Sequence, residues 1–194
     1  MPKQITEYFA ILKNSLGRIT GTDSRGKIYP CGEAVRRAIA LLGSQAKKGG
    51  RLFFIGNGAS ASIASHQAVD FWKNTRIPAL SFNDAALLTC ISNDYGYAHV
   101  FEKPVELFMT PRDVLVAISS SGESQNIVNA ALAARRRKSK ILTLTGFRPS
   151  NRLKQLGDFN FHVPAAEYGF VEVSHHAILH CMQDMISKKR LNNQ

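Results

Sequence analysis

The residues most suggestive of chemistry form a serine-rich segment, Ser119-Ser120-Ser121-Gly122-Glu123-Ser124. An apolar run, 114–118, precedes it, and a stretch of helical composition, 125–136, follows it. A turn between a strand and a helix presents unpaired N–H groups and the positive end of the helix dipole, to which serine hydroxyls add donors. The turn holds no Lys or Arg, so it would bind phosphate through neutral dipoles, which suits a small phosphorylated metabolite that must be released again. In the alternative interpretation Ser124 only caps the helix, but four serines and a glycine together favour anion binding.

A second set of residues could transfer protons or bind a metal. His66 and Asp70 are four residues apart, and Glu172 and His180 are eight apart, so each pair shares one face of its helix. Two imidazoles and two carboxylates could form acid/base pairs or a zinc-like site. Each residue also has a structural explanation, as a hydrogen-bonded, solvated or core side chain, and the pattern alone leaves these alternatives open.

A third segment, Gly56-Asn57-Gly58-Ala59-Ser60, superficially resembles a dinucleotide-binding turn. It lacks the third glycine, and no acidic residue stands at a strand end about 20 positions further on. We therefore expect no nucleotide cofactor.

These residues need a scaffold, and the chain alternates between apolar and amphipathic segments. Strands are predicted at 51–55, 78–82, 114–118, 140–145 and 159–163, and helices at 4–17, 32–47, 60–73, 84–92, 125–136 and 169–189. Residues 18–29 are interpreted as a polar connection. Continuous apolar strands separated by helices indicate an α/β fold, with a five-stranded parallel sheet covered on both faces. Both Gly/Ser turns would then lie at the C-terminal edge of the sheet, where such folds bind ligands.

Composition limits the function classes. The 194 residues, 44% of them hydrophobic, fit a single domain spanning 1–194. The chain has no apolar run long enough to span a bilayer and no signal-peptide pattern, and its three scattered cysteines suggest reduced thiols, so we expect a cytoplasmic protein without a membrane partner. The net charge of +11 could attract nucleic acid or anionic metabolites. The basic clusters fall near helix ends and no nucleic-acid motif accompanies them, so nucleic acid is not the expected partner.

Taken together, these segments resemble the sugar isomerase (SIS) domain family, and within it the phosphoheptose isomerase branch. The resemblance covers about residues 30–190, plus an N-terminal helical extension of about 1–29. It is carried by the segments 56–60, 91–97, 117–124 and 142–146 and by the helices with His66 and His180. The serine turn is typical of SIS domains in general, whereas the Asn-Asp-Tyr-Gly segment and the two histidines are more specific to the branch.

The resemblance implies a function and a site. The fold would be the flavodoxin-like sandwich described above, in a homotetramer with active sites between subunits. The substrate would be a ketose phosphate, typically sedoheptulose 7-phosphate, converted to the aldoheptose 7-phosphate. Catalysis falls on Asp70 and His180. Phosphate and sugar binding falls on Asn57, Ser60, Asp94, Ser119, Ser120, Ser121, Ser124 and Glu172. One zinc ion per subunit would be held by His66, Asp70, Glu172 and His180; a metal-free acid/base cluster is the alternative.

The sequence departs from the family pattern at three positions. Asp70 is one methylene shorter than the usual glutamate, Glu172 replaces a glutamine, and Gly169 stands where an aspartate is usual. These departures keep a second hypothesis open, a non-catalytic SIS adaptor such as a replication-initiator-binding regulator or a sugar-phosphate sensor. The carboxylate at 70 and the histidine at 180 favour the enzyme.

Overall fold

The computed structural model describes residues 1–191. Along the chain the elements are α1 (Pro2–Gly17), β1 (Thr20–Asp23), β2 (Ile28–Pro30), α2 (Cys31–Ala46), β3 (Leu52–Ile55), α3 (Ala59–Asp70), the π-helical turn η1 (Phe71–Thr75), β4 (Ala79–Ser81), α4 (Ala85–Tyr95), the 3-10 turn η2 (Tyr97–His99), α5 (Glu102–Phe108), β5 (Val114–Ser119), α6 (Gln125–Arg136), β6 (Lys140–Thr145), α7 (Arg152–Leu156), β7 (Phe159–His162) and α8 (Tyr168–Leu191). The predicted α/β alternation is confirmed. None of the helices within 1–191 combines the length and apolar composition needed to cross a bilayer.

The sheet has seven strands in the order β2-β1-β7-β6-β5-β3-β4. The five strands from β7 to β4 are parallel, as expected from their apolar runs. Between β3 and β4 the chain moves toward one edge, and it then crosses back to place β5 on the other side of β3. The strand order therefore reverses between β3 and β5, and the turns that follow these two strands face a crevice typical of ligand binding.

The prediction of a polar connection at 18–29 is wrong. This segment forms the hairpin β1–β2, with β1 antiparallel to both β2 and β7, so the sheet has seven strands instead of five. Asp23 closes the hairpin because its Oδ1 accepts from the backbone N–H groups of Arg25 and Lys27, at 2.9 and 3.0 Å. β1 and β2 are four and three residues long, and β2 forms the edge of the sheet, where polar residues are tolerated.

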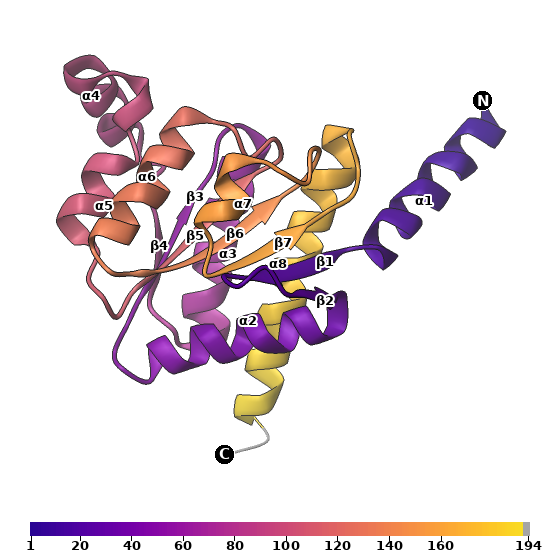
Figure 1. The fold of residues 1–194 in the computed structure, drawn as a ribbon, viewed down its shortest axis with the longest axis horizontal. Coiled ribbons are helices and arrows are strands. Elements are labelled where there is room, and N and C mark those ends of the chain that lie inside the picture. Colours follow the sequence, from indigo (N-terminus) through magenta and orange to yellow (C-terminus); the bar gives the residue numbers. More distant parts are fainter. Residues whose placement is uncertain (192–194) are drawn as a thin grey trace.

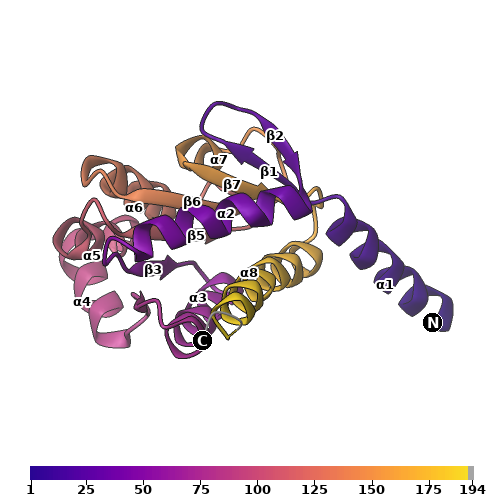
Figure 2. The same cartoon turned by 90° about the horizontal axis from the view of Figure 1, so that it is seen from below.

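Helices cover both faces of the sheet (Figures 1 and 2). One buried cluster packs α2, α3 and α8 against one face, through residues such as Ala38, Ala64 and Leu179. The other packs α5, α6 and α7 against the opposite face, through residues such as Val105, Ala130 and Leu153. Two helices important for the site, α3 and α8, therefore lie in the same layer.

The N-terminal helix α1 projects from this body in both views (Figures 1 and 2). It touches the start of α8, where the Tyr8 and Phe170 ring centroids are 4.7 Å apart. Large apolar side chains remain exposed along it, including Ile5, Phe9 and Ile11. An amphipathic helix with an uncovered apolar face is typical of a contact with another chain.

Candidate active site

A pocket of about 240 Å³ lies at the strand-order reversal. We call it the serine pocket, and its lining comes from the turn after β3, the turn after β5 and the start of α8: Asn57, Gly58, Ala59, Ser60, Ile118, Ser119, Ser120, Ser121, Ser124, Tyr168 and Glu172. The structure thus brings together seven of the predicted substrate-binding residues. Of the described residues that line it, Glu172 alone carries a formal charge.

The serine turn is held in its shape by local hydrogen bonds and by α7 behind it. The Gly122 N–H donates to the backbone oxygen of Ser119 at 3.1 Å, and Gly122 adopts a φ of +67°. A Cβ at this position would stand 2.1 Å from Asn151 Oδ1, so glycine is required there for both conformation and space. The Leu153 N–H donates to the Gly122 carbonyl at 3.0 Å, and the Arg152 N–H donates to Glu123 Oε1, also at 3.0 Å.

Two hydroxyls of the turn are available to a ligand. Ser124 is the N-cap residue of α6, yet its side chain makes no capping hydrogen bond. The Ser120 Oγ is buried and has no hydrogen-bond partner within the described chain. Buried hydroxyls usually have partners, so the Ser120 hydroxyl, like the uncapped N-terminus of α6, has hydrogen-bonding capacity that the described chain does not use.

The turn after β3 is fixed by a side-chain network. Gly56 is needed because a Cβ there would come within 2.5 Å of the Ser60 backbone. The Asn57 amide exchanges two hydrogen bonds of 2.9 Å with the Asn126 amide at the start of α6. The Tyr97 hydroxyl donates to Asn57 Oδ1 at 3.0 Å. Asn57 is therefore oriented from two sides before any ligand arrives.

Asp94 does not line the serine pocket. It lies exposed on α4, where its carboxylate oxygens contact Asn93 Nδ2 at 2.9 Å and Cys90 Sγ at 3.6 Å. From the same predicted segment, 91–97, it is Tyr97 that reaches the site. A role for Asp94 in this chain's own pocket has no support in its position.

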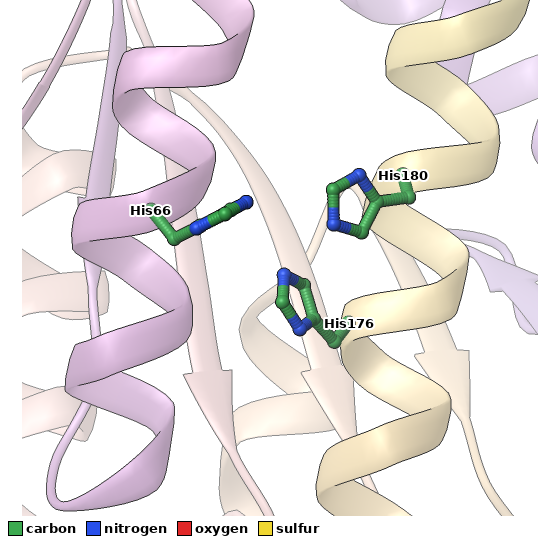
Figure 3. Close-up of side chains that lie close together, drawn as sticks. All are labelled: His66, His176 and His180. Atoms are coloured by element: carbon green, nitrogen blue, oxygen red, sulfur yellow. The ribbon is translucent and has the colours of Figure 1, made fainter.

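The other predicted residues meet between α3 and α8. Asp70 Oδ2 lies 3.1 Å from His66 Nε2 and 3.7 Å from His180 Nδ1. A third imidazole, His176, joins them, with ring centroids 5.0 Å from His66 and 4.5 Å from His180. Figure 3 shows the three rings converging from the two helices. We call His66, His176 and His180 the histidine cluster; one ring nitrogen from each lies within 4.8 Å of the others.

Burial tunes the titration of two groups beside this cluster. It raises the pKa of the Glu172 carboxyl, because burial disfavours the charged form. Burial, and next the proximity of His180 and His66, lowers the pKa of His176, while Asp70 opposes that shift. His176 is therefore biased toward the neutral imidazole that binds metals or accepts protons.

Of the four predicted zinc ligands, the contacts join His66, Asp70 and His180, whereas Glu172 lines the serine pocket. Sequence reasoning missed His176 as a site residue, together with Tyr97, Asn126 and Tyr168. The spacing of Glu172, His176 and His180 at four-residue intervals on α8 was the available signal for His176. The other three depend on contacts between distant segments.

Comparison with known proteins identifies the family to which this chain belongs. Residues 31–146 match the SIS domain family. A phosphoheptose isomerase of Proteus mirabilis is 34% identical over 163 residues, covering 81% of this chain and 84% of the relative. Phosphoheptose isomerase structures from Neisseria gonorrhoeae and Francisella tularensis superpose with TM-scores of 0.84 and 0.83, at 28% and 26% identity; each alignment covers 96% of this chain and 98% and 97% of the other chain, respectively. The chain belongs to the SIS domain family.

Proposed function

We propose that this protein is a phosphoheptose isomerase that interconverts sedoheptulose 7-phosphate and D-glycero-D-manno-heptose 7-phosphate. The observation that carries the proposal is that α3 and α8 each contribute to both parts of the site. Ser60 and Glu172 line the serine pocket, and His66 and His180 on the same helices flank the Asp70 carboxylate. Relatives named phosphoheptose isomerases support the choice of sugar.

In this proposal the substrate's phosphate binds the serine turn. The hydroxyls of Ser119, Ser120, Ser121 and Ser124 and the α6 N-terminus donate to its oxygens. Asn57 and Ser60 hold the sugar chain, and Glu172, which lines the same pocket, contacts the sugar hydroxyls. Neutral donors allow the product to leave again.

The chemical step is an aldose–ketose proton transfer. A base removes one proton from C1 of the ketose, the C1–C2 enediol forms, and a proton is delivered to C2 while the O1 hydroxyl proton moves to O2, so atoms and electrons balance. Asp70 and His180 are the proposed acid/base pair because their Oδ2 and Nδ1 atoms are 3.7 Å apart. The shorter aspartate keeps the carboxylate function of the usual glutamate.

The same residues fit a zinc ion. His66, Asp70 and His180 supply nitrogen and oxygen donors, and both Glu172 and His176 lie one or two turns from His180 on α8. Zinc bound there supplies a Lewis acid for the sugar carbonyl.

A homotetramer and a cytoplasmic location are parts of the same proposal. The exposed apolar face of α1, with Ile5, Phe9 and Ile11, supports association with further copies. The three cysteines are free, which supports a reducing compartment. Light scattering of the purified chain and cell fractionation test these two points.

The deciding experiment is incubation with sedoheptulose 7-phosphate in D₂O. We expect the aldoheptose phosphate to form, with solvent deuterium at C2 of the product. An Asp70→Asn variant is the matched control, since it removes the base while leaving the serine pocket intact. Binding of the sugar without product or deuterium exchange in the wild-type protein would refute the isomerase and favour the non-catalytic sensor.

A further inference from the structure

The histidine cluster contains one imidazole more than the predicted metal site. His66 comes from α3, whereas His176 and His180 come from successive turns of α8. All three rings point into the same gap (Figure 3). Three imidazole nitrogens from two helices form a donor set that zinc accepts, with a fourth position left for water or substrate.

His176 shows a further sign of an absent partner. Its Nε2 atom is buried and has no hydrogen-bond partner within the described chain. A buried ring nitrogen without a partner is unfavourable. A cation in the gap would give this nitrogen a ligand bond and explain its position.

Glu172, in contrast, lies in the serine pocket and not among the nitrogen donors. It lines the serine pocket beside Tyr168, one helical turn before His176. It is not part of the group whose donor atoms lie within 4.8 Å of one another. A carboxylate that faces the substrate pocket is better placed to contact the sugar than to complete the metal site.

We propose that His66, His176 and His180 form a three-histidine zinc site in this protein, in which His176 replaces Glu172 as a ligand and Asp70 acts beside the ion instead of binding it. Asp70 contacts His66 and His180 and orients their rings, as carboxylates do for metal-bound histidines. An imidazole has two ring nitrogens, so His180 can bind the ion with one and exchange a proton with the other. The inference deepens the proposed function by specifying the metal site, and it is tested without an activity assay.

Zinc binding should also draw the three rings together. The donor nitrogens lie within 4.8 Å of one another, whereas nitrogens bound tetrahedrally at about 2.1 Å from zinc stand about 3.4 Å apart. Rotation of the His66 and His180 side chains can bring the nitrogens this much closer. Both side chains are free enough to rotate, because 52% and 40% of their surface is exposed.

The test is zinc affinity of the chelator-treated full chain, measured by competition with a fluorescent zinc indicator. We expect about one zinc per wild-type chain and an affinity at least about 100-fold weaker in His176→Ala, since a direct ligand is lost. Glu172→Ala should stay within about threefold of wild type. Val173→Ala, an exposed residue between them, is the matched control for alanine on this helix and should also bind normally.

Either of two results would overturn the inference: unchanged affinity in His176→Ala, or a loss in Glu172→Ala as large as that in His176→Ala. If His176→Ala does not fold, long-range ¹H–¹⁵N spectra of the wild-type protein decide instead. Zinc should then shift the ring nitrogens of three histidines, and a shift of only two would contradict the proposal. A protein that binds zinc through His176 but shows no turnover would support this inference and refute the isomerase.

Discussion

The serine pocket and the histidine cluster are neighbours, yet they are built in different ways. The pocket is lined largely by residues of two turns, 57–60 and 118–121 with Ser124, and these turns offer neutral donors. The cluster joins residues more than 100 positions apart and consists of titratable groups. The pocket therefore depends on local backbone geometry, whereas the cluster depends on how α3 packs against α8. A disturbance of helix packing should affect chemistry before it affects phosphate binding.

The largest expected effect separates chemistry from binding. Asp70→Asn should lower kcat by about 10²–10⁴-fold, the usual contribution of a positioned acid or base. The Kd for the phosphosugar, measured by calorimetry, should change little because Asp70 lies outside the serine pocket. Asp184→Asn, an exposed acid further along α8, serves as control. Equal losses of kcat and affinity would mean that the two regions are not separable.

Outside the histidine cluster, the buried His162 is a further titratable group, and it makes stability depend on pH. Burial, with a smaller contribution from the Lys154 cation, lowers the pKa of His162 to about 4, and His175 is its other titratable neighbour. An unfolded histidine binds its proton near pH 6.5, so the stabilisation is complete above that pH and is lost as the pH falls toward 4. Between pH 7 and pH 4 the wild-type protein should lose up to about 3 kcal/mol more unfolding free energy than His162→Asn. Parallel urea-denaturation curves for the two proteins would count against this assignment.

Removing single hydroxyls from the serine turn tests whether the serine pocket binds phosphate. Ser121→Ala and Ser124→Ala should each weaken phosphosugar binding by about 1–3 kcal/mol, the scale of a hydrogen bond to a charged group. Calorimetry with the phosphorylated and the dephosphorylated sugar measures the difference. If both sugars lose affinity equally, the serine turn does not bind the phosphate.

The smallest expected effect is that of Ser124→Ala on the stability of the ligand-free protein. Because the Ser124 side chain makes no capping hydrogen bond, Ser124→Ala should change the unfolding free energy by less than about 0.5 kcal/mol. A true N-cap would cost about 1 kcal/mol. Thermal or urea unfolding of the ligand-free variant decides between them, and a loss of the larger size would return Ser124 to a structural role.

Patterns local in the sequence were the predictable ones. Continuous apolar runs predicted the five parallel strands, and the Gly/Ser composition after two of them predicted the pocket. The hairpin β1–β2 was not predicted because short strands near a sheet edge can be polar. Its alternation of buried and exposed residues extends over only three or four residues. The turn Asp23-Ser24-Arg25-Gly26 was the signal that could have revealed it.

Contacts between distant segments were harder to predict. The spacing of His176 from His180 places it on the correct face of α8, but it does not show that this face meets His66. Asp94 lies outside this chain's serine pocket, exposed on α4, whereas Tyr97 of the same segment contacts Asn57.

The hydrogen bonds from α7 to the serine turn have a consequence for protein synthesis. The serines at 119–124 leave the ribosome about 30 residues before Asn151, Arg152 and Leu153, which hold Gly122 and Glu123 from behind. A nascent chain that has reached only β6 carries every hydroxyl of the proposed phosphate site but lacks this support. The turn can therefore reach the shape described here only after α7 has been synthesised and can fold against it.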